Sequence, residues 1–262
     1  MQNLASLHVL YAMSGFCVGA LVGMTGVGGG SLMTPLLILL FGVHPATAVG
    51  TDLLFAASTK TLGTAIHAAA RSVDWKLVGL LALGSVPATV ATLIVLTGLD
   101  LRGASAQHVI ALTLGGVLLV TALFLIAGKS IRQRYAGRLD RLDRRTTGFF
   151  TIALGLVMGV LVTGTSIGAG AIGVTVLLIL HPKMPAARVV GSDIAHAVPL
   201  TFLAGAGHWY LGTIDWRLLG ILLTGSLPGI VAGSYLATRS REVVVRIALA
   251  AVLVIAGVRL LG

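Results

Sequence analysis

Apolar segments long enough to cross a lipid bilayer recur from one end of the sequence to the other. A transmembrane helix needs about 20 consecutive, mainly apolar residues. Only 10% of the residues are charged, against about a quarter in a typical soluble domain, and no separate soluble domain fits between the segments. The sequence therefore predicts an all-α polytopic membrane protein with about eight to ten transmembrane elements. The apolar segments are residues 8–25, 30–42, 47–71, 77–97, 108–127, 148–164, 168–181, 186–211, 217–237 and 243–261.

Two of these segments, residues 30–42 and 168–181, are shorter than a full membrane span. Each follows the first apolar segment of its half of the chain. Three interpretations stay open for them: a half-helix, a tilted span, or the returning arm of a re-entrant hairpin.

The start of the chain lacks the basic stretch and the small-residue cleavage site of a signal peptide. We therefore interpret it as the beginning of the first membrane segment. Cys17 is the only cysteine, which excludes an intrachain disulfide and a cysteine-built metal site. We expect Cys17 to pack as a small apolar residue.

Basic residues are concentrated in one linker, residues 128–147, which separates an N-terminal repeat (residues 1–127) from a C-terminal repeat (residues 148–262). If this linker is cytoplasmic, most of the 18 Lys and Arg residues fall on the cytoplasmic side, as the positive-inside rule requires. The exceptions outside the membrane are Arg102, Arg217 and Arg259. This distribution predicts a multi-pass protein of the bacterial inner (plasma) membrane. It explains the net charge of +10 by orientation, with contact to anionic membrane lipid as a secondary effect, and without a nucleic-acid partner.

The two halves of the chain repeat each other. Residues 15–40 align with 155–180, and residues 50–91 align with 191–232. Whether the short segments span the membrane or re-enter it, each half has an odd number of crossings (three or five). The repeats are therefore predicted to have inverted topology. Inverted repeats are frequent in secondary transporters, whose substrate site lies near the membrane midplane where the repeats meet. The alternative is duplication for stability alone. Identical pairs include Asp52/Asp193, His67/His208, Asp74/Asp215, Trp75/Trp216 and Pro87/Pro228.

Glycine-rich breaks follow the first apolar segment of each repeat, as "GMTGVGGGSLMTP" and "TGTSIGAGAIGVT". Each glycine weakens a helix by about 1 kcal/mol relative to alanine, and broken backbone at membrane depth must be buried or line a wet cavity. The amides that begin the next half-helix lie at the positive end of its dipole, which suits an anion. Close helix packing is the alternative, and a nucleotide-binding phosphate loop is a poorer one because its Gly-Lys-Ser/Thr ending is missing. The candidate anion-binding residues are Thr25, Gly28, Gly29, Gly30, Ser31, Thr165, Ser166, Gly168 and Gly170.

Charged residues also occur inside the predicted membrane segments, at Asp52, Lys60 and Asp193. A charge at the bilayer centre costs about 2.5–3.5 kcal/mol on insertion scales, so such a side chain usually faces a cavity or a partner. Lys60 lies about 12 Å along the helix axis from Asp52, but it could pair with Asp193 across the repeat interface. Its counterpart in the second repeat is Thr201. We expect Lys60 to supply positive charge to a bound anion; a purely structural ion pair is the alternative.

Proton coupling or charge balance is the role predicted for Asp52, Asp193 and three histidines near them, namely His67, His196 and His208. Histidine titrates near neutral pH and can carry protons. For His67 and His208, which lie near the membrane edges, interfacial hydrogen bonding with Trp75 and Trp216 is the alternative.

Enzyme motifs are missing from the sequence. Neither the G-x-S-x-G elbow of a hydrolase nor the H-E-x-x-H motif of a zinc protease occurs. We therefore expect no catalytic residue, no metal ion and no cofactor.

Several of these motifs, taken in order and duplicated, resemble the sulfite exporter TauE/SafE family of bacterial membrane transporters. They are "GVGGGSLMTP", "SIGAGAIGV", the "VDW" and "IDW" turns, the segments around His67 and His208, and the Gly-Ser-x-Pro pairs at residues 84–87 and 225–228. The resemblance covers nearly the whole chain. It implies movement of sulfite or organosulfonates across the inner membrane, with some relatives implicated in sulfate uptake. The chain departs from the pattern at Ala169 and Thr175, and its three membrane charges exceed the minimal family pattern.

These observations together predict a secondary transporter for a small sulfur oxyanion, with export as the expected direction and alternating access as the mechanism. Protons are the expected coupling ion, and the sequence leaves a homodimer open. The alternatives are a sulfate uptake permease, a cation-coupled carrier that uses Asp52 and Asp193 as ion ligands, and a non-transporting membrane scaffold.

Overall fold

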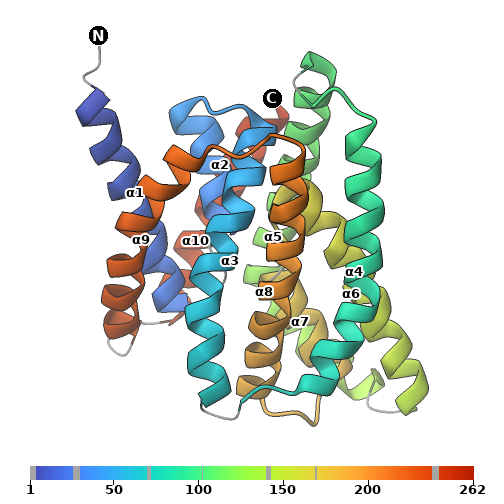
Figure 1. The fold of residues 1–262 in the computed structure, drawn as a ribbon. Helices are drawn as coiled ribbons and strands as arrows, with labels where there is room; N and C mark the ends of the chain where they lie inside the picture. Colours follow the sequence, from blue (N-terminus) through green and yellow to red (C-terminus); the bar gives the residue numbers. More distant parts are fainter. Residues whose placement is uncertain are drawn as a thin grey trace.

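The computed structural model describes residues 4–25, 30–69, 72–101, 103–139, 143–168, 170–237 and 242–262. Within these ranges the chain is built of α-helices and short connections, as the sequence predicts (Figure 1). The helices are α1 (Leu4–Thr25), α2 (Gly30–Phe41), α3 (Pro45–Ala69), α4 (Trp75–Thr97), α5 (Ala104–Leu139), α6 (Arg144–Thr165), α7 (Ala171–Leu180), α8 (Ala186–Tyr210), α9 (Trp216–Ala237) and α10 (Glu242–Leu261).

Six helices in the described part of the chain are long and apolar enough to cross a membrane. They lie in α1, α4, α5, α6, α8 and α9. The protein is therefore a multi-pass membrane protein. Helix α3 is 25 residues long, but it is not among the six because it carries Asp52 and Lys60 among several hydroxyl side chains. Helix α3 is thus too polar to be recognised as a membrane span by its composition, and it carries the candidate site residues Asp52 and Lys60.

The short helices α2 and α7 do not extend from one end of the bundle to the other. Helix α2 joins α3 at the upper end of Figure 1, where α1 also begins, whereas α7 joins α8 at the lower end, where α6 begins. Each long helix and its short partner therefore return to the end of the bundle from which they start. Of the three interpretations left open by the sequence, the returning arm of a re-entrant hairpin describes both α2 and α7.

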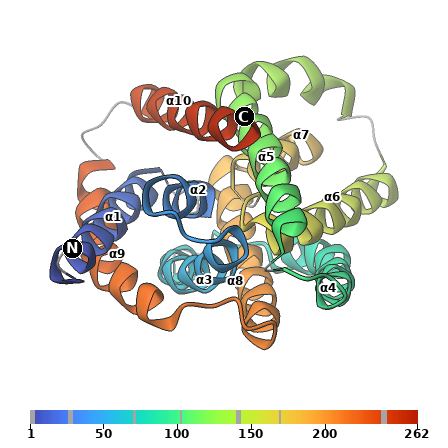
Figure 2. The same ribbon diagram turned by 90° about the horizontal axis from the view of Figure 1, so that it is seen from above.

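Three pairs of helices divide the bundle when it is viewed from above (Figure 2). Helices α1 and α9 lie on one side, α4 and α6 on the other, and α3 packs against α8 between them. In the aligned repeats α1 corresponds to α6 and α4 to α9, so the two outer pairs are equivalent. This arrangement fits a pseudo-symmetric molecule; the inverted relation of the repeats stays a prediction.

Glycines allow the helices of each outer pair to touch backbone to backbone. A Cβ on Gly155 of α6 would meet the carbonyl group of Leu81 in α4, and a Cβ on Gly15 of α1 would meet the carbonyl group of Leu222 in α9. Cys17, which we expect to pack as a small apolar residue, is exposed on the surface of α1. At about 100° per residue it points away from the face that Gly15 turns toward α9.

The repeated Asp-Trp turns join the two halves. Asp74 caps α4 by accepting from the amides of Lys76 and Leu77, at 3.0 and 3.2 Å, and its own amide donates to Ser192 Oγ at 2.7 Å. In the other half, Asp215 accepts from the amide of Leu218 at 2.9 Å to cap α9. The remaining bond is the counterpart of the Asp74–Ser192 bond: the amide of Asp215 donates to Thr51 Oγ1 at 3.0 Å.

These hydrogen bonds place the candidate site. Thr51 and Ser192 directly precede Asp52 and Asp193 in the chain, so each turn holds the helix that carries the buried aspartate of the opposite half. On the lower side, Arg188 adds an ion pair with Asp74 at 3.5 Å.

Candidate functional site

The break between α6 and α7 consists of residues with left-handed or otherwise positive φ. Ser166 has φ 60°, Gly168 has φ 128° and Gly170 has φ 116°. Side chains with a Cβ are disfavoured in such conformations, so the glycines permit the chain to leave α6 and begin α7 within a few residues. Helix α7 starts without a side-chain cap, and the first amides of a helix have no partner inside it.

The two hydroxyl groups at this break have different environments. Thr165 Oγ1 donates to the carbonyl oxygen of Leu161 at 2.6 Å and accepts from the amide of Ile167 at 3.2 Å, so it serves the backbone. Ser166 Oγ is buried without a hydrogen-bond partner in the described residues. It lies beside the carboxylate of Asp52 but does not complete a hydrogen bond to it. Of the two, Ser166 is the one available to a ligand.

The break between α1 and α2 is only partly described. Gly28 and Gly29 lie outside the described residues, and Thr25, Gly30 and Ser31 are placed as helix ends whose side chains are not described. Just beyond them in α2, Thr34 Oγ1 donates to Asp52 Oδ2 at 2.5 Å. Asp52 is 0% exposed, and its other oxygen, Oδ1, has no partner in the described residues.

Asp193 lies against the start of the other short helix. The backbone amide of Gly170, the N-cap of α7, faces its carboxylate and stabilises the negative charge. Its Oδ1 would be 2.5 Å from a Cβ on Gly173, so this glycine provides the space that the carboxylate occupies. Asp193 is 1% exposed, and Oδ1 has no hydrogen-bond partner in the described residues.

Lys60 connects the two carboxylates. Its ammonium group, on α3 and only 7% exposed, interacts electrostatically most strongly with Asp193 on α8 and also with Asp52 on its own helix. The sequence-based idea that Lys60 meets Asp193 across the repeat interface agrees with this geometry. The cluster therefore combines two carboxylates, one ammonium group and the starts of two half-helices, all inside the membrane region.

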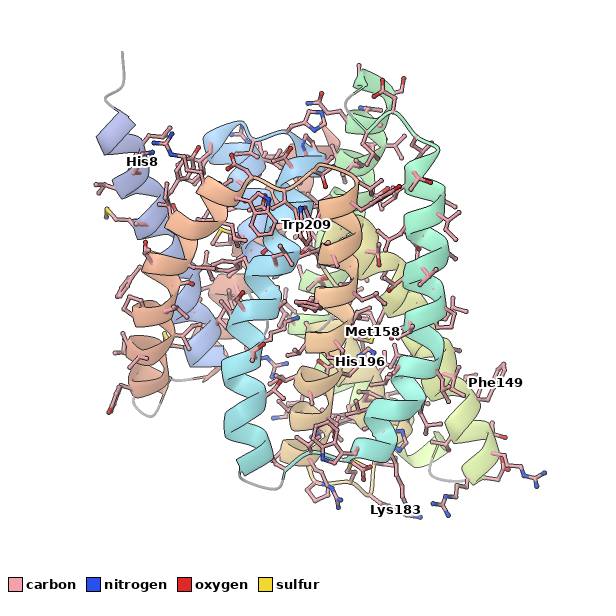
Figure 3. All side chains as sticks on the ribbon, viewed as in Figure 1. His8, Phe149, Met158, Lys183, His196 and Trp209 are labelled. Carbon is pink, nitrogen blue, oxygen red and sulfur yellow. The ribbon has the colours of Figure 1, made fainter. Side chains whose placement is uncertain are left out.

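His196 belongs to the same cluster. Lys60 acts electrostatically on its ring, and its Nε2 is hydrogen-bonded to Ser85 Oγ of α4 at 2.8 Å. Its Nδ1 is buried without a partner in the described residues. In Figure 3, His196 is drawn between Trp209 near the upper end of the bundle and Lys183 at the lower end, as expected for a side chain within the membrane.

His208 lies apart from this cluster. Its Nδ1 is hydrogen-bonded to Thr213 Oγ1 and its Nε2 donates to the carbonyl oxygen of Thr163, both at 2.9 Å. Both ring nitrogens of His208 therefore have partners other than Trp216, the partner suggested by the sequence. Trp216 instead packs edge to face on Trp209, with 5.6 Å between the ring centroids. The backbone of His67 lies in α3, and its side chain is not described.

A cavity of about 460 Å³ lies at the upper end between α4 and α5. Residues of the α4–α5 turn and of the first turns of α5 line it, together with Gly164 of α6. Gly164 is two residues from Ser166, so the cavity extends from the end of the bundle to the vicinity of the second break.

Comparison with known proteins gives a family match over nearly the whole chain. Residues 11–260 match the family model described as Sulfite exporter TauE/SafE. The chain belongs to the sulfite exporter TauE/SafE family. A TauE/SafE chain is a membrane transporter, which agrees with the membrane-spanning helices and the expected location in a bacterial inner membrane.

Named relatives are similar over almost their whole length. The chain is 36% identical to the probable membrane transporter protein YjnA of Bacillus subtilis over 256 residues, 97% of this chain and 100% of the relative. It is 27% identical to the probable membrane transporter protein YdhB of the same organism, over 94% of this chain and 97% of the relative. It is 25% identical to the probable membrane transporter protein MJ0441 of Methanocaldococcus jannaschii, over 84% of this chain and 81% of the relative. No solved structure matches the chain significantly.

Two members of the cluster in this TauE/SafE chain are missing from our sequence-based set. Ser85 lies in the repeated Gly-Ser-x-Pro motif of α4, a signal that could have found it. Thr34 has Val174 at the aligned position of the second repeat, so no repeated motif marks it. Its role depends on how α2 packs against α3.

Proposed function

We propose that this TauE/SafE chain moves a small sulfur oxyanion, sulfite or an organosulfonate, across the membrane by alternating access, with export as its physiological direction. The observation that carries the proposal is the buried Lys60 of α3, whose ammonium group interacts with Asp193 in the other repeat. Asp193 in turn faces the amide at the start of α7. An ammonium group and free helix amides are suitable donors for sulfur oxyanion oxygens. Ser166 Oγ, which has no partner in the described residues, adds a hydroxyl donor.

The cavity near Gly164 supports alternating access. It lies at the upper end of the bundle, opposite the basic linker, and its lining includes Gly164, two residues before Ser166. On the lower side, Arg188 and Asp74 tie the start of α8 to the start of α4. In the proposed cycle this lower closure opens while the upper access closes, and the site around Lys60 is exposed to each side in turn.

Proton coupling through Asp52, Asp193 and His196 is part of the proposal. The three side chains are linked electrostatically to Lys60, so a change of charge on any of them alters the field at the substrate. A carrier that binds a metal cation between Asp52 and Asp193 is less well supported, because Lys60 already supplies positive charge to both carboxylates. Sulfate uptake would use the same donors and is distinguished by the direction of flux.

The proposal predicts that Lys60→Gln abolishes the flux of sulfite, and of taurine or sulfate if these are substrates, in proteoliposomes. The variant keeps a polar side chain, which is one atom shorter, and removes its charge. Lys129→Gln, an exposed position near the end of α5, serves as the matched control and is expected to keep wild-type flux. Size-exclusion profiles of both variants should match the wild type. Unchanged flux in a folded Lys60→Gln protein would contradict the role of the ammonium group.

A further inference from the structure

The carboxylate of Asp193 occupies the place at which the proposed substrate would bind. It is opposite the Gly170 amide at the start of α7, and an added Cβ on Gly173 would fall 2.5 Å from its Oδ1. It is also the carboxylate with the strongest electrostatic interaction with Lys60. The donors proposed for the substrate therefore interact with an anion that belongs to the protein.

Buried polar atoms without a hydrogen-bond partner occur in the cluster that contains this carboxylate. Asp193 Oδ1, Ser166 Oγ and His196 Nδ1 are all buried, and none has a hydrogen-bond partner in the described residues. Buried polar atoms usually have a partner, and an unsatisfied one calls for an explanation. Asp52 Oδ1 is a fourth such atom in the cluster. Ser166 Oγ and His196 Nδ1 are explained if they donate to the oxygens of a ligand in the loaded state, and Asp193 Oδ1 is explained if it carries a proton that faces this ligand.

We infer that Asp193 is a tethered competitor of the substrate, so that an oxyanion binds only together with a proton that neutralises this carboxylate. This inference rests on the proposed function and specifies its coupling. When an anion binds, its oxygens accept hydrogen bonds from the ammonium group of Lys60 and the amide of Gly170, in place of the Asp193 carboxylate. The Asp193 carboxylate then loses both stabilising partners and faces a like charge, which favours its protonated form.

The other groups around Asp193 do not replace the lost charge. Helix α3 contributes Lys60, together with Asp52, which is coupled through Lys60. Helix α4 contributes Ser85, and α8 itself contributes His196. Helix α6 contributes the thioether of Met158, which lies near Gly173, as Asp193 Oδ1 does. Arg188 lies at the start of α8, paired with Asp74.

Asp52 is the less suitable proton acceptor. It keeps the hydroxyl of Thr34, which donates to Asp52 Oδ2 at 2.5 Å and stabilises the ionised form. This bond comes from α2 and does not involve Lys60 or α7. The proton taken up with the anion is therefore assigned to Asp193, and its transfer balances as one carboxylate plus one proton giving one carboxylic acid.

The test measures anion binding and proton uptake together in the purified full-length protein. The probes are sulfate and methanesulfonate, which stay ionised between about pH 5 and about pH 8, so that any proton bound comes to the protein. Sulfite is measured in parallel, with its own change of protonation subtracted. A pH-indicator dye in weak buffer reports the protons, and calorimetry in two buffers reports the same number independently.

The wild-type protein is expected to take up about one proton per bound anion, and its affinity should fall about tenfold per pH unit at high pH. Asp193→Asn should bind the anion without proton uptake and with little pH dependence. The matched control is Asp143→Asn, an exposed cap of α6 that asparagine also fills; it should behave like the wild type.

The outcomes separate the two proposals. Anion binding by the wild type without proton uptake, or proton uptake that survives in a folded Asp193→Asn protein, would overturn the tethered-competitor inference while leaving anion transport intact. If the wild type neither binds nor transports any of the three anions, the proposed function itself fails. Thermal unfolding of each variant shows whether a loss of binding reflects a loss of fold.

Discussion

At the scale of single residues, the membrane interior makes each polar group depend on its partner. An ionised side chain at the bilayer centre costs about 2.5–3.5 kcal/mol on insertion scales, so the clustering of Lys60 with Asp52 and Asp193 lowers a cost that each would otherwise bear alone. His196 follows the same rule, because its Nε2 is satisfied by one hydroxyl group from a neighbouring helix, that of Ser85.

Ser85→Ala should destabilise the protein by about 1 kcal/mol, because it leaves a buried ring nitrogen of His196 without its partner. The serine at the matching position of the second repeat provides the control. Ser226 is as deeply buried, but within the described part of the chain its hydroxyl group donates only to the carbonyl oxygen of Leu223, in its own helix, at 3.5 Å. Ser226→Ala should therefore leave the stability nearly unchanged. Thermal unfolding in detergent checks both, and equal losses would contradict a special role of the Ser85–His196 bond.

At the scale of helices, glycine has two separate functions in this protein. At Gly168 and Gly170 it permits a positive φ, which lets α6 end and α7 begin inside the membrane. Within α6 it has ordinary helical geometry and instead permits close approach to α4, at Gly155 and Gly159. The sequence singles out the glycines of the breaks but leaves close helix packing open for them, and the structure separates the two functions.

Gly155→Ala is expected to destabilise the α4–α6 pair by about 1–3 kcal/mol, since the new methyl group would fall on the carbonyl group of Leu81 and force the backbones apart. Gly148→Ala, earlier in the same helix, adds the methyl group where no atom lies within 4 Å. It should be neutral or stabilise the helix by up to about 1 kcal/mol. Unfolding of the two variants under identical conditions gives the comparison. A stable Gly155→Ala protein would show that the helices do not pack as described.

At the scale of the whole molecule, charge sets the orientation and repeated contacts hold the halves together. The lower end in Figure 1 contains the start of α6 and the turn with Lys183, and the upper end contains the start of α1 and the C-terminus. The positive-inside rule places the lower end in the cytoplasm. The bonds from Asp74 to Ser192 and from Asp215 to Thr51 join the two halves at the chain positions directly before the buried aspartates.

This orientation is checked by cysteine labelling in a Cys17→Ser background. Arg217→Cys places an exposed thiol at the start of α9, at the upper end, and Arg144→Cys places one at the start of α6, at the lower end. A membrane-impermeant maleimide should label the first in intact cells and the second only after the membrane is opened. The reverse pattern would show that the linker is outside.

Much of this architecture follows from the sequence. The apolar segments and the uneven placement of Lys and Arg are enough to predict a multi-pass helical membrane protein, because a helix in lipid satisfies its own backbone and its length is set by the bilayer. The short α2 and α7, the approximate bounds of most other helices, and membership in the TauE/SafE family agree with the sequence-based predictions. Helix α5 differs, because it runs to Leu139 and so continues into residues 128–147, the segment expected to be a linker. The site residues stay predictions, with Ser166, Lys60, Asp193 and His196 brought together and His208 placed elsewhere.

The sequence by itself determined that charges lie in the membrane; only the tertiary structure decided what each of them faces. Lys60 and Asp193 are far apart in the chain, and their interaction depends on α3 packing against α8. The contact of Asp193 with the start of α7, and that of Ser85 with His196, likewise depend on neighbours from other helices. Hydropathy and length are properties of a single segment and can be read along the chain, whereas the partner of a buried charge is a property of packing.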